Sequence, residues 1–283
     1  MQLKITSPVL LFLLLIFISC KNKQPYKSPT GYDFNKPEKF VMKNSLKEIS
    51  GIAFIHGKED VLYAIEDEAA KLFSITPGSD KLSHSKFGKK GDYEDVTILN
   101  NTTVAVLKSN GSLYLFSINE IGKEKIDSVK EYEKILPEGE YEGLVADSTK
   151  LIVLCKNCPG DKEKKEVSVY ILKPASGDSL IITNTFKVDI NLIQPTGESG
   201  KEKFHPSGIA KNPVTHEWYI ISSVNKLLLI LDEQWNAKEY YPLDPSLFKQ
   251  PEGITFNSKG DLYISNEGGN GDANILLFRL KKQ

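Results

Sequence analysis

This chain of 283 residues has few cysteines, few long apolar runs and almost no excess of positive or negative charge. Only 3 residues are cysteine, which excludes a small scaffold held together by disulfides. Lys and Arg number 36 against 37 Asp and Glu, so the formal net charge is -1. A near-neutral chain lacks the basic surface that displaces counterions from phosphates, and we therefore expect no nucleic-acid partner.

The common catalytic patterns are also missing. No glycine-rich loop follows a predicted strand and opens a helix, and none of the four histidines forms a visible Ser-His-Asp arrangement. His56 and His216 fall in predicted turns, and His84 falls in a predicted outer strand. Cys155 and Cys158 form an isolated CxxC pair with no second pair and no thioredoxin-like pattern around it. A local disulfide or two free thiols are therefore favoured over a zinc or redox site.

The N-terminus carries an apolar run of ten residues, from Val9 to Ile18. A membrane-spanning helix needs roughly 20 apolar residues, so the run predicts a signal peptide over residues 1–19. The ending Phe17-Ile18-Ser19-Cys20 resembles a bacterial lipobox, in which the cysteine is lipidated and becomes the new N-terminus. An ordinary secretory peptide cut near the same place, or a short membrane anchor, is the alternative. We expect a lipid on Cys20 to hold the protein at a membrane of the cell envelope, with the outer membrane favoured over the inner.

The segment 20–38 contains three prolines and no periodic apolar pattern. It is predicted to be a flexible tether between the lipid and a single folded domain over residues 39–283.

A short phrase recurs along that domain and opens each of five similar segments. Its anchor residues are spaced by 44, 48, 65 and 45 positions and are Gly51, Asp95, Gly143, Gly208 and Gly253. Short alternating or β-branched runs separated by polar turns follow each phrase, as expected for antiparallel meanders. Helical signals are confined to Ser117–Lys123 and Pro245–Phe248.

A mean period of about 48 residues is typical of the four-stranded blades of a propeller. We therefore predict an all-β fold, a β-propeller of five four-stranded blades, with the ring closed by an N-terminal strand near Lys39–Met42. The irregular stretch Asp189–Phe204 leaves a sixth blade as the alternative.

In such blades the start of the first strand and the end of the second lie on one face beside the axis. Polar residues gather at these positions, and carboxylates dominate. Oxygen-rich clusters suit Ca²⁺ or Mg²⁺ rather than soft metals, so we predict a divalent cation, with Ca²⁺ as the candidate, at the channel mouth. Its candidate ligands are Glu48, Glu66, Asp67, Glu94, Asp95, Glu142 and Glu252. Candidate contacts for a small ligand or an envelope protein partner are Lys108, Lys156, His205, Asn225, Asn266 and Glu267.

Each acid also has a structural interpretation. A carboxylate at the start of an inner strand can accept backbone N–H bonds and join neighbouring blades. A chemical site seldom needs the same group in every blade of a repeat, which favours this alternative for any single glutamate of the phrase.

The order of the phrases resembles the SdiA-regulated (YjiK-like) family of envelope proteins. The resemblance covers the chain from about residue 45 and rests on Glu48–Phe54, Val61–Ala69, Asp92–Val96, Tyr141–Leu144, His205–Ile209, Gln250–Ile254 and Leu262–Glu267. It implies a propeller at the cell envelope with a calcium site in its channel, and it shares the seven acidic positions given above. Ser207 stands where the fourth phrase would carry an acid, which departs from a symmetrical ring.

Two functions follow as hypotheses. The first is a lipid-anchored binding module, expected to be a monomer, whose acidic mouth holds Ca²⁺ together with a small ligand or a protein partner. The second is a metal-dependent hydrolase, phytase-like or lactonase-like, which would use the same channel; that analogy rests on fold alone. No nucleophile and base pair is evident, so binding is the main prediction.

Overall fold

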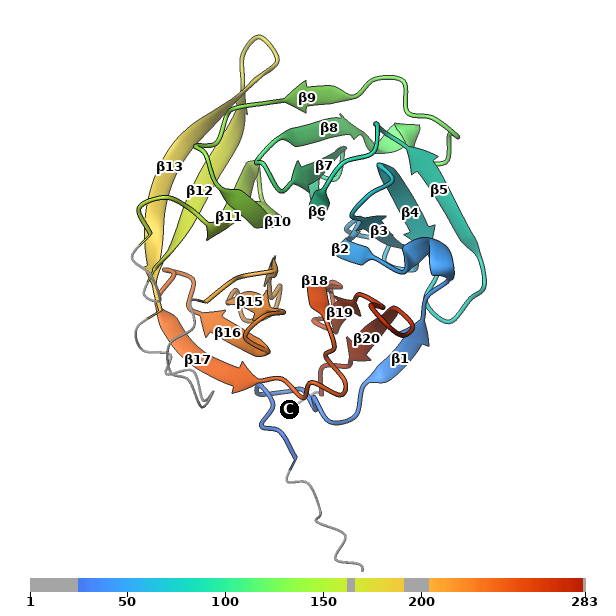
Figure 1. Cartoon of the computed structure of the whole chain (residues 1–283), viewed down its shortest axis with the longest axis vertical. Helices are drawn as coiled ribbons and strands as arrows, with labels where there is room; N and C mark the ends of the chain where they lie inside the picture. Colours follow the sequence, from blue (N-terminus) through green and yellow to red (C-terminus); the bar gives the residue numbers. More distant parts are fainter. Residues whose placement is uncertain (1–24, 162–165, 191–203, 282–283) are drawn as a thin grey trace, which may run out of the picture.

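Twenty β-strands and two short 3-10 helices make up the regular structure of residues 25–161, 166–190 and 204–281, which the computed structural model describes. The strands form five four-stranded sheets, set as blades around a central axis (Figure 1). The predicted five-bladed propeller is therefore confirmed. The predicted signal peptide, Cys20 and most of the irregular stretch before Phe204 lie outside the described residues.

Blades one to four run in chain order from an inner strand at the axis to the circumference, blade five ends on β1, and all strand pairings within the blades are antiparallel. Blade one contains β2 (Ile49–Phe54), β3 (Leu62–Glu66), β4 (Lys71–Ile75) and β5 (Leu82–Lys86). Blade two contains β6 (Tyr93–Leu99), β7 (Thr103–Lys108), β8 (Leu113–Ser117) and β9 (Lys130–Tyr132). Blade three contains β10 (Glu140–Asp147), β11 (Lys150–Asn157), β12 (Glu166–Ala175) and β13 (Ser179–Asp189). Blade four contains β14 (Gly208–Lys211), β15 (Trp218–Ser222), β16 (Leu227–Leu231) and β17 (Ala237–Pro242). Blade five contains β18 (Pro251–Phe256), β19 (Leu262–Asn266), β20 (Asn274–Phe278) and β1 (Glu38–Val41).

The 3-10 helices are η1 (Asn44–Leu46) and η2 (Ile118–Glu120). The second lies within the predicted helical turn, and the Ser117 side chain caps it by accepting from the Asn119 N–H. The other predicted helical turn, Pro245–Phe248, is a single turn that is not continued into a helix, in which Phe248 N donates to Asp244 O at 2.8 Å.

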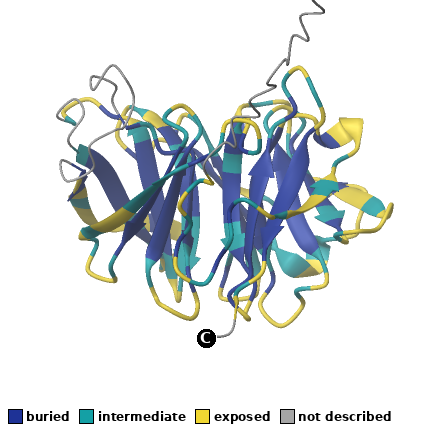
Figure 2. Ribbon diagram, turned by 90° about the horizontal axis from the view of Figure 1, so that it is seen from below, coloured by how far each residue is buried: buried dark blue, intermediate teal, exposed yellow. Residues whose placement is uncertain are grey.

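The hydrophobic core consists of five layers, each between two neighbouring blades. Side chains of β15, β16, β18, β19 and β20 fill one layer, for example, and the other four interfaces are built in the same way. The strands are mostly buried, whereas exposed residues concentrate in the turns and on the outer strands (Figure 2). Because each layer joins two blades, the apolar core holds the ring together without any central helix.

Glycines in the recurring phrase let inner strands approach one another closely. A Cβ atom on Gly253 would lie 2.4 Å from the Ser50 carbonyl oxygen of the next blade, and one on Gly51 would lie 2.3 Å from Asp95 Oδ1. The recurring glycine therefore marks the tight packing of inner strands around the axis.

The ring closes in the outer position of blade five, as predicted. Strand β1 pairs with β20, with Phe40 opposite Ile275, so N- and C-terminal segments share one sheet. This arrangement covers the edge that β20 would otherwise expose.

Part of the segment expected to be a tether packs against the propeller. Tyr32 and Phe34 are buried in the layer between blades four and five, and the Phe34 and Phe278 ring centroids are 4.7 Å apart. The Tyr32 hydroxyl also donates to the Gly260 carbonyl oxygen at 2.6 Å. The two aromatic side chains bury enough apolar surface to fix this stretch, despite its prolines. Among the described residues, no helix has the length and apolar character that crossing a membrane requires.

Candidate functional site at the channel mouth

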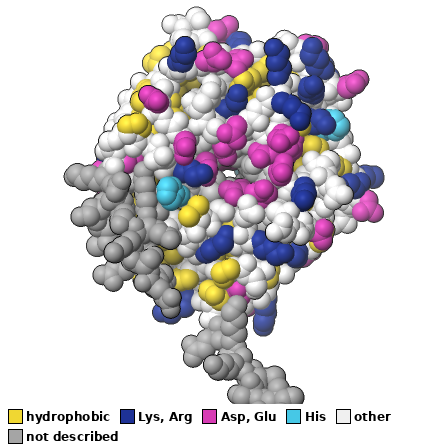
Figure 3. Space-filling model, viewed as in Figure 1, with side chains coloured by type: hydrophobic (Ala, Val, Ile, Leu, Met, Phe, Trp, Pro, Cys, Tyr) yellow, Lys and Arg dark blue, Asp and Glu magenta, His cyan; other side chains and the backbone are white. Residues whose placement is uncertain are grey.

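Acidic side chains surround the opening at one end of the propeller axis (Figure 3). The strand register explains this gathering, since the start of each inner strand lies opposite the end of the second strand. Ile49 pairs with Glu66, Tyr93 with Lys108, and Pro251 with Asn266.

The strand register assigns the glutamates of the recurring phrase to two different positions, which the phrase alone does not distinguish. Glu48 precedes Ile49 as Asp92 precedes Tyr93, so Glu48 and Asp92 are equivalent. Glu94 instead corresponds to Ser50 of blade one. The candidate acids therefore form two groups with different surroundings.

The first group, here called the blade-one cluster, consists of Glu48, Glu66 and Asp67. One carboxylate oxygen from each residue lies within 4.8 Å of the other two. Glu66 is buried and shapes the following turn, because its carboxylate accepts from Ala69 N at 2.6 Å and from Glu68 N at 3.3 Å. That turn brings Asp67 beside Glu48.

The blade-one cluster concentrates negative charge. Burial, the largest cause, and the neighbouring carboxylates of Glu48, Glu66 and Glu267 together raise the pKa of Asp67 to about 7. Burial and Glu48 likewise raise the pKa of Glu267, whose Oε2 accepts from Gln250 Nε2 at 2.7 Å. Among the described residues, no lysine or arginine forms an ion pair with any of the three cluster acids. A bound cation would therefore remove unfavourable charge repulsion here.

The second group, here called the axial ring, consists of Glu94, Glu142 and Glu252. Burial raises the pKa of Glu94 to about 9, and Glu142 is the acid that adds most to this shift. Burial and then Glu142 raise the pKa of Glu252 to about 8. These glutamates lie at the second or third residue of the inner strands of blades two, three and five, which places them at the same end of the axis.

The axial ring contains its own positive charge. Lys156 Nζ forms an ion pair with Glu142, and the two side chains are 29% and 12% exposed. Burial alone would lower the pKa of Lys156, but the hydrogen bond with Glu142 and the charges of Glu142, Glu94 and Glu252 raise it overall. This ammonium compensates part of the ring's charge, which distinguishes the ring from the blade-one cluster.

Asp95 belongs to neither group. It is 3% exposed, and its carboxylate accepts from Val96 N at 2.8 Å and from Leu144 N at 2.7 Å. Asp95 therefore joins blade two to blade three, the structural role weighed for every acid of the phrase.

The polar candidates are spread around the mouth. Lys108 ends β7, with its Nζ 5.7 Å from the centre of the Tyr93 ring. Asn225 accepts from His205 N at 2.9 Å and from Ser222 Oγ at 2.8 Å, which stabilises the turn after β15. Asn266 is fully buried and donates to Asn274 Oδ1 at 3.2 Å, so it connects two strands of blade five.

Two further charged residues, Asp92 and Lys226, belong to the mouth, and neither is among the candidates predicted from the sequence. Asp92 raises the pKa values of Glu94 and Glu142, and burial lowers the pKa of Lys226 while Glu252 opposes that shift. Asp92 could have been found from its position, three residues before the anchor Asp95, as Glu48 is before Gly51. Lys226 has no counterpart in the phrase.

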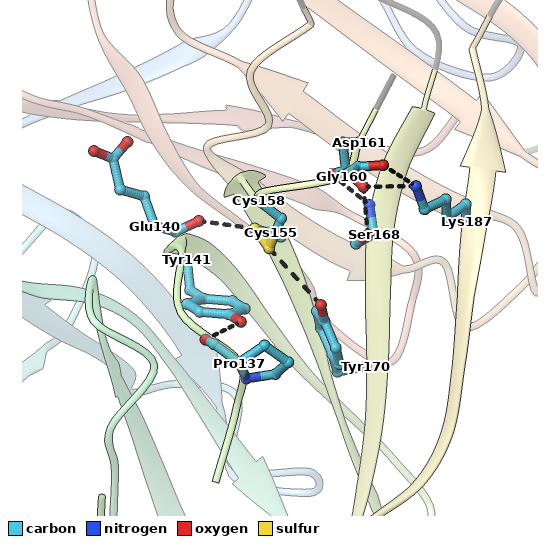
Figure 4. The surroundings of a disulfide bond; sticks show 10 residues. All are labelled: Pro137, Glu140, Tyr141, Cys155, Cys158, Gly160, Asp161, Ser168, Tyr170 and Lys187. Atoms are coloured by element: carbon cyan, nitrogen blue, oxygen red, sulfur yellow. Dashed lines mark hydrogen bonds and ion pairs between the residues drawn. A yellow bond between two sulfur atoms is a disulfide. The ribbon is translucent and has the colours of Figure 1, made fainter. Parts of the chain in front are cut away.

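The CxxC pair is a disulfide that flanks Lys156. Cys155 and Cys158 are joined at the end of β11 and are almost fully buried (Figure 4). The rings of Tyr141 and Tyr170 lie on either side, with centroids 5.8 Å apart. The bond therefore constrains the turn that carries Lys156.

The opposite end of the channel has a different lining. A cavity of about 170 Å³ is bordered there by apolar stretches of all five inner strands, including Ile52–Phe54 and Val96–Ile98. The turns that hold His56 and His216 lie at this end of their blades. Lys211 also borders this cavity, with its Nζ 3.2 Å from Asp147 Oδ2, so the carboxylate groups of the mouth are not the only charged residues along the channel.

Comparison with known proteins supports the same architecture. No curated protein matches the sequence. A luciferin-regenerating enzyme shares 10% identity at a TM-score of 0.51, over 86% of this chain and 95% of its own. A structural genomics protein of unknown function from Bacteroides thetaiotaomicron shares 12% identity at a TM-score of 0.50, over 89% of this chain and 73% of its own. At such identities the likeness shows the fold alone.

The family model described as SdiA-regulated matches residues 29–270. The match spans the buried Tyr32 and Phe34, all five inner strands and every acid of the mouth. This confirms the family resemblance seen in the recurring phrases, and the chain belongs to the SdiA-regulated family.

Proposed function

We propose that this protein is a binding module of the cell envelope whose channel mouth holds Ca²⁺ in the blade-one cluster. The observation that supports the proposal is the convergence of Glu48, Glu66 and Asp67 within 4.8 Å without a basic partner among the described residues. The ion in turn would give the mouth a positive centre for a small ligand or for an acidic group of an envelope protein.

The donor set favours a hard cation. All three side chains offer carboxylate oxygens, the ligands that Ca²⁺ takes at 2.3–2.6 Å in sets of six to eight. Glu48 is exposed and Asp67 is half-buried, so water can complete the coordination shell. Soft metals would require sulfur or imidazole donors that the cluster lacks.

A calcium titration followed by thermal unfolding tests the proposal. An ion that binds only the folded state stabilises it by about 2.7 kcal/mol at a concentration 100 times its Kd. We expect the melting temperature to rise with Ca²⁺ and to rise less in Glu48→Gln. The matched control is Glu140→Gln, because Glu140 occupies the position equivalent to Glu48 in blade three. An unchanged melting temperature at millimolar Ca²⁺ would remove the ion from the proposal.

The lipid anchor is a separate part of the proposal. It rests on the apolar run before Cys20, and a single acyl chain provides membrane affinity of about 0.8 kcal/mol per buried CH₂. Expression of wild type and Cys20→Ala, followed by membrane fractionation, tests it. We expect only the wild type to sediment with membranes and to incorporate labelled fatty acid.

One observation favours the hydrolase as a second candidate. A carboxyl group whose pKa is raised to about 9, as in Glu94, stays protonated at neutral pH and can act as a general acid. A panel of carboxylic and phosphate esters would be assayed with Ca²⁺, using wild type, Glu94→Gln and Glu142→Gln. Turnover that survives both substitutions would exclude the axial ring as its site.

A further inference from the structure

One strand position in the mouth carries opposite charges in two blades. Ile49 pairs with Glu66 and Tyr141 pairs with Cys155, so the residue that follows this pair is Asp67 in blade one and Lys156 in blade three. In blade one this position supplies a carboxylate to the cluster. In blade three it supplies an ammonium to the axial ring.

The ammonium of Lys156 already provides positive charge beside the glutamates of the axial ring. Its Nζ pairs with Glu142, and it also interacts electrostatically with Glu94 and Glu252. Because the ammonium is covalently tethered, it competes with a dissolved cation at a high effective concentration. A metal ion that entered the ring would have to displace the Lys156 ammonium from Glu142. The half-buried ammonium would then lie beside a second cation, which is unfavourable.

The backbone around Lys156 favours this placement. The disulfide between Cys155 and Cys158 encloses Lys156, and Cys155 is 1% exposed. Lys108, which ends the second strand of blade two, lies over the Tyr93 ring and has no ion pair among the described residues. The two lysines thus lie at the same end of their blades, one strand position apart, and make different contacts.

We propose that Lys156 is the resident cation of the axial ring and that it restricts Ca²⁺ binding to the blade-one cluster. The placing of Ca²⁺ in the blade-one cluster rests on the proposed function, whereas the exclusion of a metal ion from the axial ring does not. Lys156 acts here as a specificity-determining residue, because removing its charge converts the ring into a second cation site.

Calcium stoichiometry measured by isothermal titration calorimetry tests the inference. We expect one ion per chain for the wild type and two for Lys156→Gln, with the added site lost again in Lys156→Gln combined with Glu94→Gln. Lys156→Arg keeps the charge and should bind one ion, and so should the matched control Lys108→Gln. Thermal unfolding checks that each variant is folded. Lys156→Met, which keeps most of the aliphatic stem, replaces Lys156→Gln if the latter does not fold.

The outcomes separate this inference from the proposed function. Equal stoichiometry in the wild type and Lys156→Gln overturns the inference while leaving calcium binding intact. Two ions in Lys156→Arg or in Lys108→Gln also overturn it, because the charge of Lys156 would not be the cause. No ion in the wild type and one in Lys156→Gln supports the inference and contradicts the proposed calcium site.

Discussion

The blade-one cluster and the axial ring share one mouth but handle negative charge differently. The cluster brings three carboxylates together without a basic side chain among the described residues, whereas the ring carries Lys156 in an ion pair with Glu142. Both lie at the end of the blade where the start of the inner strand meets the end of the second strand. An acidic repeat therefore does not define a metal site by itself; a compensating side chain decides whether an external cation is needed.

Asp95 is an acid of the same phrase with a purely structural role. Among the proposed substitutions, its replacement should have the largest effect on the free energy of unfolding. Asp95→Ala leaves Leu144 N without its acceptor at the contact between blades two and three. We expect the free energy of unfolding to fall by about 3 kcal/mol, since hydrogen bonds to a buried carboxylate are worth about 1.5–3 kcal/mol each. Urea denaturation measures this loss. A calcium affinity that fell in the folded variant would contradict the assignment of Asp95 to structure.

Removing two carboxylates from the blade-one cluster should abolish stabilisation by calcium. The double variant Glu48→Gln with Asp67→Asn retains the shape of both side chains but leaves Glu66 as the only cluster carboxylate. We expect loss of the roughly 2.7 kcal/mol gained at 100 times the wild-type Kd. Melting temperatures with and without Ca²⁺ report the difference. Retained stabilisation would place the ion elsewhere, and the axial ring would be examined next through Glu252→Gln.

The axial ring should make stability fall as pH rises. The pKa of Glu94 is raised from 4.5 to about 9 in the folded protein, so its neutral form favours folding. That contribution is complete below pH 4.5 and is lost as pH rises toward 9. After allowance for water at the mouth, we expect a decrease on the order of 2 kcal/mol between pH 5 and pH 9 in calcium-free buffer.

Glu94→Gln cannot ionise and should flatten this pH profile. Denaturant midpoints at five or six pH values would show it, with Glu131→Gln, an acid outside the mouth, as the control. Identical slopes for wild type and Glu94→Gln would show that Glu94 does not carry a raised pKa.

Lys108 should have the smallest effect. It lies at the end of a second strand, as Lys156 does, but makes only a cation–π contact with Tyr93 at 5.7 Å. We expect Lys108→Gln to change the free energy of unfolding by less than about 0.5 kcal/mol. A larger change, measured beside Lys156→Gln in the same buffer, would mean that the two lysines are not as different as their contacts indicate.

Much of the mouth could be predicted because a propeller repeat relates distant residues through their place in the phrase. The spacing predicts one strand position for Glu66, Lys108, Lys156 and Asn266, and the register confirms it for Glu66, Lys108 and Asn266. In blade three Cys155 is the residue opposite Tyr141, so Lys156 lies one position further along. The phrase does not predict which glutamates are equivalent, because these residues lie at different distances along the chain from their anchor residues. Glu48 precedes its anchor by three residues and Glu94 by one, a difference that strand pairing alone resolves.

The sequence by itself determined the number of blades, the closure by an N-terminal strand and the end of the axis where the acids gather. These features follow from period and alternation, which are local properties of the chain. Only the tertiary structure decided which acids meet, which of them Lys156 compensates and which one, Asp95, bonds the neighbouring backbone. Those outcomes depend on distances of a few ångströms between blades, and packing between blades is set by side chains far apart in the chain.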